Sequence, residues 1–108
     1  MGTILVISTL PDRDHAEKMA HFLIEQQLAA CVNILPGATS VYRWQGKVES
    51  ADETILLIKT TMARYPALEA AIKAQHPYEL PEIIAVPISA GLPAYLEWVA
   101  TETSSKNN

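Results

Sequence analysis

The sequence contains one cysteine, Cys31, among its 108 residues. A single cysteine excludes an intramolecular disulfide and any zinc site built only from cysteine ligands. Because Cys31 begins an apolar segment, it is more typical of a small buried hydrophobic residue than of a nucleophile. The lack of disulfides fits a reducing compartment, and the N-terminal residues show no positively charged leader, so we expect a cytoplasmic protein.

Long apolar runs and clustered positive charge are also missing. Hydrophobic residues make up 49% of the chain, yet no run approaches the roughly 18 apolar residues that a membrane span requires. Eight Lys and Arg residues are scattered among twelve Asp and Glu residues, which gives a net charge of -4. Binding to nucleic acid depends on concentrated positive charge, so we expect neither a membrane nor a nucleic acid as partner.

The motifs of conventional enzymes are absent from the sequence as well. It has no Ser/His/Asp order typical of a hydrolase, no glycine-rich phosphate loop and no Cys/His spacing suited to zinc. We therefore expect a protein that is not an enzyme and that requires no cofactor.

The sequence does contain an alternation of strand-like and helix-like patterns. Short β-branched apolar runs are typical of strands, and apolar residues spaced by three or four positions are typical of amphipathic helices. These patterns predict strands at residues 3–9, 30–44, 47–61 and 82–88, and helices at residues 12–27, at residues 65–75 and from Pro93 onward. The strand at 30–44 is interrupted by Pro36 and Gly37 and is expected to bend there.

The predicted order, βαββαβα, indicates one α+β domain that covers residues 1–108. Two βαβ-like halves fold as a ferredoxin-like sheet with the first two helices on one face, followed here by a short C-terminal helix. Residues from about 101 to 108 are polar and are expected to fray.

The third predicted strand implies that this sheet has a second apolar face. Its residues Ile55, Leu56, Leu57 and Ile58 are consecutive and apolar, and neighbouring strand residues point to opposite faces. Two helices cover only one face, and a large bare apolar patch is unusual for a soluble monomer. The long hairpin also has unpaired edges that a second subunit could pair. We therefore expect the chain to self-associate.

Four sequence blocks carry a resemblance to a known family. They are AACVNILPGATSVYRWQGK at residues 29–47, LIKT at residues 57–60, HPYELPE at residues 76–82 and YLEW at residues 95–98. With these blocks in this order, over roughly residues 3–100, the chain resembles the CutA family, the divalent-cation-tolerance proteins. The resemblance implies a ferredoxin-like subunit in a tight homotrimer similar in plan to PII signalling proteins. It also implies an association with tolerance to copper and other divalent metals.

One histidine is a candidate metal ligand. His76 follows the second predicted helix, and its imidazole could bind copper, which favours nitrogen ligands. A helix C-terminus, however, favours the protonated imidazole, which cannot bind a metal. Family members proposed to bind copper carry a histidine before this position and a cysteine in the first strand, where this chain has Gln75 and Ser8. The first interpretation of His76 is therefore a structural or helix-capping role, and the second is a copper ligand.

The remaining candidate site consists of polar and aromatic residues, namely Tyr42, Trp44, Glu53, Lys59, Tyr78 and Glu82. In one interpretation the aromatic residues form subunit interfaces and Lys59 pairs with Glu53 or Glu82, since an unpaired buried charge is costly. In the other, the six residues line a cleft between neighbouring subunits that binds a metal-bearing or anionic small molecule. Lys59 would then supply positive charge, and Tyr78 or Trp44 would form the apolar wall.

Together these observations predict a non-enzymatic homotrimer involved in the response to divalent metal ions, with copper or another divalent cation as a candidate ligand. The first alternative is a PII-like sensor of a small metabolite. The second is a structural scaffold for another protein.

Overall fold

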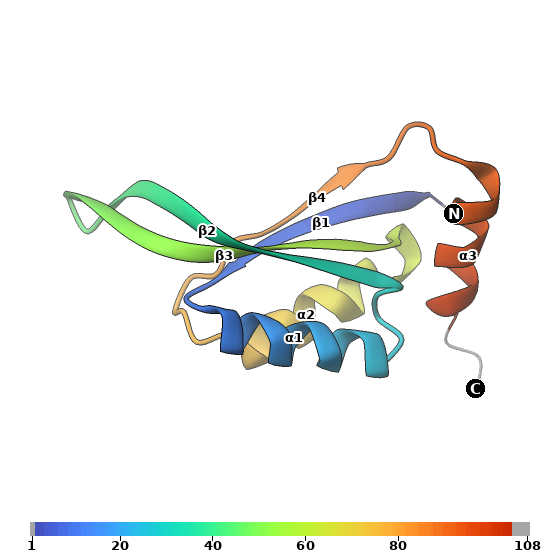
Figure 1. Ribbon diagram of the computed structural model, residues 1–108, viewed down its shortest axis with the longest axis horizontal. Helices are drawn as coiled ribbons and strands as arrows, with labels where there is room; N and C mark the ends of the chain where they lie inside the picture. Colours follow the sequence, from blue (N-terminus) through green and yellow to red (C-terminus); the bar gives the residue numbers. More distant parts are fainter. Residues whose placement is uncertain (1, 105–108) are drawn as a thin grey trace.

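The computed structural model describes residues 2–104, and within them four strands form one antiparallel sheet in the order β2-β3-β1-β4 (Figure 1). The elements follow each other in the predicted order. They are β1 Thr3–Leu10, α1 Arg13–Glu25, β2 Cys31–Trp44, β3 Lys47–Thr61, α2 Tyr65–Gln75, β4 Ile83–Pro87 and α3 Pro93–Glu102. A short 3-10 helix, Met62–Arg64, precedes α2. The predicted ferredoxin-like α+β arrangement is confirmed.

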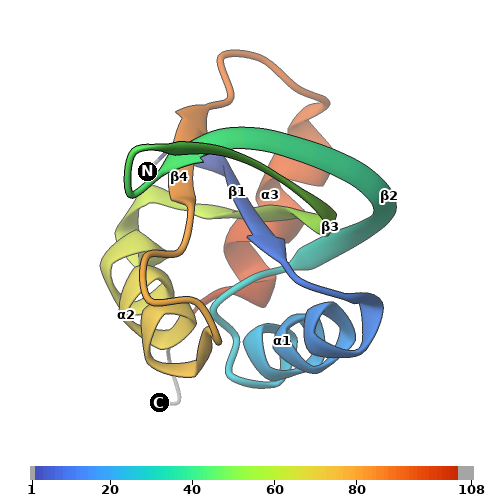
Figure 2. The same ribbon diagram turned by 90° about the vertical axis from the view of Figure 1, so that its left-hand side faces the viewer.

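Helices α1 and α2 lie side by side against one face of the sheet, whereas α3 lies at one end of it (Figures 1 and 2). The hydrophobic core fills the layer between the sheet and these two helices. Its fully buried members include Ile4, Val6, Leu10, Leu23, Leu56, Ile58, Leu68 and Ile72. Alternate residues of the two central strands face this layer, because strand side chains alternate between faces.

Helix α1 begins as predicted and ends two residues earlier than predicted. Asp12 is its N-cap, and the Asp12 carboxylate accepts a hydrogen bond of 2.8 Å from the backbone N–H of His15. At the other end Gln27 adopts a left-handed φ of 57°, a conformation that terminates helices. The N–H of Leu28 then bonds to the carbonyl of Leu23, so the chain turns toward β2.

Strand β2 is long and bent, as the sequence predicts. It pairs with β3 along its length, but the register shifts between Leu35, which lies opposite Ile55, and Ala38, which lies opposite Glu53. One extra residue of β2 is therefore accommodated there, as in a β-bulge. Within this segment Gly37 has a φ of 87°, which glycine adopts without steric cost.

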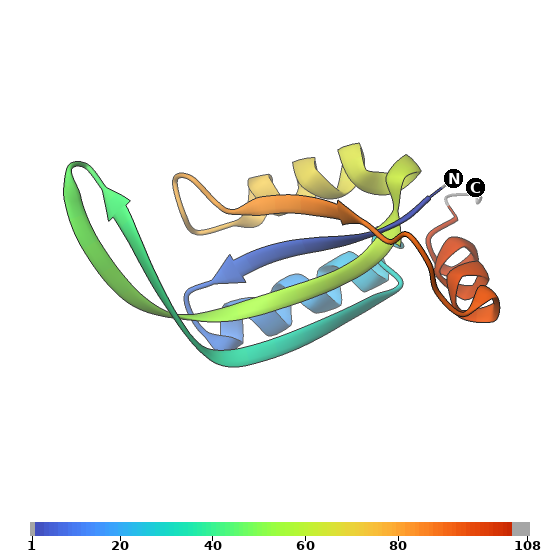
Figure 3. The same cartoon turned by 90° about the horizontal axis from the view of Figure 1, so that it is seen from above.

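The β2–β3 hairpin continues past the end of the central strand. The last paired residue of β1, Leu10, lies opposite Thr54, so the outer part of the hairpin pairs only with itself. This part projects from the sheet and curves toward the turn between α2 and β4 (Figure 3). At its tip Gln45 and Gly46 both have positive φ, which is typical of a tight two-residue turn between antiparallel strands.

The prediction that the chain frays from residue 101 is wrong for the residues that the structure describes there. Helix α3 includes Thr101 and ends at Glu102. Thr103 is only 1% exposed, and its hydroxyl donates a 2.8 Å hydrogen bond to the carbonyl of Val99. Val99 is itself fully buried, so its burial holds the last turn in place. Residues 105–108, the rest of the predicted tail, lie outside the described residues.

The face of the sheet opposite α1 and α2 is largely apolar, and we call it the open face. Its apolar residues include Leu5, Ile7, Ile55, Leu57, Ile84 and Val86, and the register also places Asn33 and Lys59 on this face. Ile7 lies opposite both Leu57 and Ile84, which places these three side chains together. Ile84 and Val86, on edge strand β4, are 49% and 46% exposed. The uncovered apolar face inferred from the sequence is therefore present in the structure.

Two isoleucines provide a matched test of the core. Ile58 is fully buried in β3, whereas Ile24 on α1 is 40% exposed. Truncating a fully buried isoleucine to alanine costs about 2–5 kcal/mol through lost burial and a residual cavity. We predict that Ile58→Ala lowers the free energy of unfolding by this amount, whereas Ile24→Ala changes it far less. Urea denaturation of the two variants measures the difference, and equal losses would contradict this assignment of the core.

Candidate functional site

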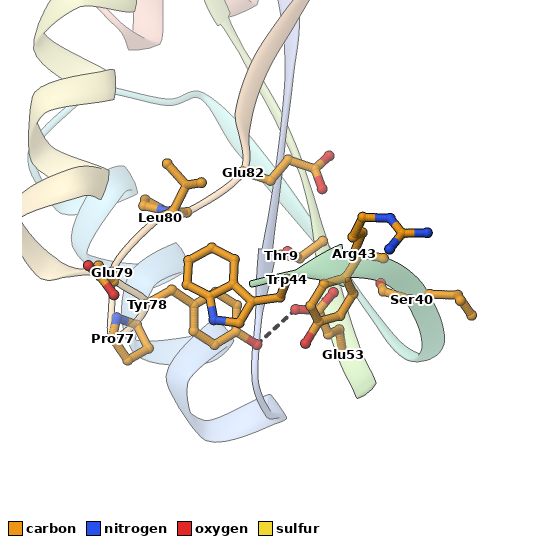
Figure 4. A pocket seen from close by; sticks show the side chains of 13 residues that line it. Thr9, Ser40, Arg43, Trp44, Glu53, Pro77, Tyr78, Glu79, Leu80 and Glu82 are labelled. Carbon is orange, nitrogen blue, oxygen red and sulfur yellow. Dashed lines mark hydrogen bonds between the residues drawn. The ribbon is translucent and has the colours of Figure 1, made fainter. Parts of the chain in front are cut away.

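A cavity of about 900 Å³ lies between the projecting part of the hairpin and the segment that joins α2 to β4. We call it the hairpin cavity (Figure 4). Its lining residues are Thr9, Ser40, Val41, Tyr42, Arg43, Trp44, Glu53, Pro77, Tyr78, Glu79, Leu80, Pro81 and Glu82. The volume falls in the range of small-molecule sites, roughly 300–1,000 Å³.

Five of the six residues predicted as a polar and aromatic cluster line this cavity: Tyr42, Trp44, Glu53, Tyr78 and Glu82. They come from three different segments, namely β2, β3 and the connection between α2 and β4. Two physical features bring them together. Tyr42 and Trp44 are two positions apart and so share a strand face, and the curved hairpin carries that face toward residues 77–82 (Figures 3 and 4).

One hydrogen bond joins two walls of the cavity. The hydroxyl of Tyr78 donates to a carboxylate oxygen of Glu53 at 2.8 Å (Figure 4). Burial, reinforced by this bond and by the negative charge of Glu53, raises the pKa of Tyr78 well above its ordinary value. Tyr78 therefore remains a neutral donor to the Glu53 side chain.

His76 lies next to the cavity, and both of its ring nitrogens contact backbone groups. Its Nε2 lies 2.7 Å from the carbonyl oxygen of Thr9, and its Nδ1 accepts a hydrogen bond of 3.1 Å from the backbone N–H of Tyr78. Since Nδ1 is an acceptor, the ring is neutral and Nε2 carries the proton that is donated to Thr9. Both nitrogens are thus engaged in fixing the start of the 77–82 segment to the end of β1.

The electrostatic surroundings of His76 differ from those expected at a helix C-terminus. Burial lowers the pKa of the imidazole, and this effect outweighs the hydrogen bond to Thr9 and the nearby charge of Glu53, which both raise it. The charge of His15 lowers the pKa further. The ring also packs against Tyr78, with 4.9 Å between the ring centroids.

The residues that the structure describes do not form a metal centre within one chain. No three His, Cys, Asp or Glu side chains converge as metal ligands anywhere in residues 2–104. Ser8 is fully buried, and its hydroxyl has no hydrogen-bond partner among these residues. A metal at His76 would have to replace one of the two hydrogen bonds of the imidazole.

Lys59 is the predicted site residue that the structure separates from the others. It does not line the hairpin cavity, and its ammonium group donates to the side-chain carbonyl of Asn33 and lies 3.9 Å from the sulfur of Cys31. Within the described residues of one chain, Lys59 forms an ion pair with neither Glu53 nor Glu82. Lys59 and Glu53 share a strand face but are six residues apart on β3, a separation of roughly 20 Å.

Two charged residues of the cavity were not predicted from the sequence. Glu79 belongs to the HPYELPE block, so its neighbours Tyr78 and Glu82 could have indicated it. Arg43 lies between Tyr42 and Trp44, and strict alternation would have placed it on the opposite face of β2. Its guanidinium donates a long hydrogen bond of 3.4 Å to the carbonyl of Gly46 in the hairpin turn.

Comparison with known proteins connects this architecture to one family. The family model described as CutA1 divalent ion tolerance protein matches residues 4–102 of the chain. The chain belongs to this family. The divalent-cation tolerance protein CutA of Thermus thermophilus is 48% identical over 99 residues, which cover 92% of this chain and 96% of that protein. The resemblance identified from the sequence is confirmed.

Two further relatives share this region, one along the whole of its own length and one along only part of its own length. The crystal structure of CutA from Xylella fastidiosa matches with a TM-score of 0.93 at 49% identity, covering 96% of this chain and all of that one. The chloroplastic protein CutA of Arabidopsis thaliana is 45% identical over 101 residues, which cover 94% of this chain. The match covers only 56% of that plant protein, so the latter has additional sequence outside the CutA1 region.

The neutral state of His76 predicts a pH dependence of stability. Its pKa in the folded chain lies below the ordinary value of 6.5, so the unfolded chain binds more protons at mildly acidic pH. The stability that this residue contributes is fully present above pH 6.5 and is lost as the pH falls through the lowered folded value.

We predict that the fall in the urea midpoint between pH 7.5 and 5 is smaller in His76→Ala than in the wild-type chain. His21→Ala, a change at an exposed position of α1, serves as the control and is expected to keep the wild-type dependence. An unchanged dependence in His76→Ala would show that His76 is not held neutral.

Proposed function

We propose that this CutA1-family chain acts as a non-enzymatic homotrimer in the response to divalent metal ions, and that the hairpin cavity is its ligand site. The observation that carries the proposal is the convergence of three distant segments on one cavity lined by Tyr42, Trp44, Glu53, Tyr78 and Glu82. The names of the relatives, which refer to divalent-cation tolerance, support the biological context. No conventional catalytic motif was found in the sequence, which supports a binding function.

The open face supports the proposed assembly. Exposed apolar side chains on this scale favour burial against another protein surface, and Ile84 and Val86 are among the exposed ones. The edges of the projecting hairpin likewise offer unpaired backbone groups. The number of three subunits rests on the family resemblance, and a second copy of this chain is the partner that we propose.

The proposed assembly and the proposed ligand site adjoin each other. Thr9 and Glu53 line the hairpin cavity, and by strand alternation both share a face with the open-face residues Ile7 and Ile55. A subunit that covers the open face would therefore approach the rim of the cavity. This supports a ligand site that is completed between neighbouring subunits.

A PII-like sensor of a small metabolite is the second candidate function, and the volume of the hairpin cavity favours it. The cavity is large enough for an organic molecule, whereas no three potential metal-ligating side chains converge within the described residues. The two functions are compatible if the metal response proceeds through a bound small molecule. We expect such a protein to act in the cytoplasm. None of the helices in the described part of the chain has the length and apolar character needed to cross a bilayer.

The role of the open face can be tested with one charge substitution. Leu57 lies at the centre of this face, and Leu57→Glu would place a carboxylate in the proposed interface, where an unpaired charge is costly. We predict that sedimentation equilibrium gives three times the 11.8 kDa chain mass for the wild-type protein and a lower mass for Leu57→Glu.

Ala70→Glu introduces the same charge on an exposed position of α2, away from the open face, and is expected to keep the wild-type mass. Circular dichroism checks that both variants are folded. A wild-type protein that remains a folded monomer at micromolar concentration would refute the proposed assembly.

Direct metal binding through His76 can be tested by calorimetry. Because both ring nitrogens of His76 already form hydrogen bonds, we predict that Cu²⁺ titrated into metal-free protein binds His76→Ala as it binds the wild type. His21→Ala is the control for the loss of any exposed imidazole. A tenfold weakening confined to His76→Ala, about 1.4 kcal/mol, would instead identify His76 as a copper ligand.

A further inference from the structure

The charges that line the hairpin cavity are mostly negative. Three carboxylates, those of Glu53, Glu79 and Glu82, face a single guanidinium, that of Arg43. Within residues 2–104 none of the three carboxylates forms an ion pair, whereas Arg43 is directed toward the carbonyl of Gly46. A concave surface with one sign of charge concentrates the potential of that sign. The lining that one chain contributes to the cavity therefore attracts cations and repels anions.

The position of Lys59 strengthens this conclusion. An anionic ligand was expected partly because Lys59 would supply positive charge, but within one chain Lys59 lies outside the cavity and binds Asn33. Glu53 accepts a hydrogen bond from Tyr78, which holds its carboxylate at the wall of the cavity. Lys59 of the same chain therefore does not offset the acidic side chains of the cavity.

The arrangement of these carboxylates does not suit a bare metal ion. A divalent cation needs several ligand atoms that converge on one point, and no three acidic, histidine or cysteine side chains in the described residues do so. The carboxylates are instead spread over β3 and the 77–82 segment, around a cavity of about 900 Å³. An extended molecule with separated positive charges could approach more than one of them.

Aromatic residues are the second feature of the cavity that favours an organic cation. Tyr42, Trp44 and Tyr78 line the same cavity as the carboxylates, and Trp44 remains 38% exposed. Ammonium groups are attracted to aromatic faces, most strongly to tryptophan. Aliphatic carbons between such groups would pack on Leu80 and Pro81, which also line the cavity. Bare metal ions gain nothing from these apolar surfaces.

We propose that the hairpin cavity binds an organic cation of the alkylammonium class, in which ammonium groups are joined by a short aliphatic chain. This inference rests on the proposed function, because it specifies the ligand of the same cavity. The carboxylates of Glu53, Glu79 and Glu82 hold the ammonium groups, and Trp44 and Tyr78 contact the carbon chain and its charged ends. The ligand class follows from the negative charge of the carboxylates together with the aromatic and apolar surface beside them.

Isothermal calorimetry with spermidine tests the proposal on the assembled wild-type protein at low and at physiological salt. We expect saturable binding that weakens as salt rises, because exposed charges are screened. The double variant Glu79→Gln/Glu82→Gln is expected to weaken spermidine binding at least about tenfold, through the loss of two charge-assisted contacts. Trp44→Leu is expected to weaken it roughly threefold or more through the loss of the aromatic contact.

A matched control separates a specific site from general attraction to an acidic protein. Glu97→Gln/Glu102→Gln removes two exposed carboxylates from α3, at the far end of the molecule from the hairpin (Figure 1). It changes the net charge as much as the cavity variant does. Spermidine binding to this control is expected to remain within about twofold of the wild type, since distant exposed charges are screened.

The outcomes distinguish this proposal from the proposed function. Absence of spermidine binding, or equal weakening in the two double variants, overturns the organic-cation proposal. Citrate is titrated in parallel as an anionic probe. Citrate binding that Trp44→Leu weakens would keep the hairpin cavity as a ligand site and refute only the ligand class. Failure of spermidine, citrate and a panel of nucleotides to bind would refute the ligand-site function as well.

Discussion

Strand β3 carries apolar side chains on both of its faces, and this constraint governs the rest of the structure. Leu56 and Ile58 point into the layer filled by α1 and α2, while Ile55 and Leu57 point to the open face. Exposing either face of such a strand to water costs free energy in proportion to the apolar area exposed. The chain supplies α1 and α2 for one face, and the proposed self-association would supply cover for the other.

The parts of the fold that depend on local patterns could be predicted from the sequence. Helix α2 has the predicted bounds because Pro66 favours its first turn and Pro77 prevents its continuation. The bend of β2 was predicted from Pro36 and Gly37. The left-handed conformation of Gln27 was not predicted, because glutamine rarely adopts this conformation and no local sequence pattern indicates it.

The candidate site was predictable as a set of residue types but not as a geometry. Tyr42, Trp44 and Tyr78 were identified together, yet the curvature of the hairpin that brings them together is a property of the folded chain. Lys59 was grouped with Glu53 because strand alternation indicates a shared face but says nothing of distance along the strand. Likewise, the hydrogen bond between His76 and Thr9 links residues that are 67 positions apart, so no local rule could assign the protonation state of His76.

The bulge in β2 determines which face of the strand carries Tyr42 and Trp44. Before the bulge, the β2 residues that lie opposite the open-face positions of β3 are odd-numbered, as Leu35 is opposite Ile55. After the bulge, they are even-numbered, as Ala38 is opposite Glu53. The extra residue thus reverses the alternation of the strand, which brings Tyr42 and Trp44 to the side of Glu53. Evolution can therefore lengthen or shorten this part of the hairpin freely only in steps of two residues. A step of one would turn both aromatic rings away from the cavity without disturbing the core beneath.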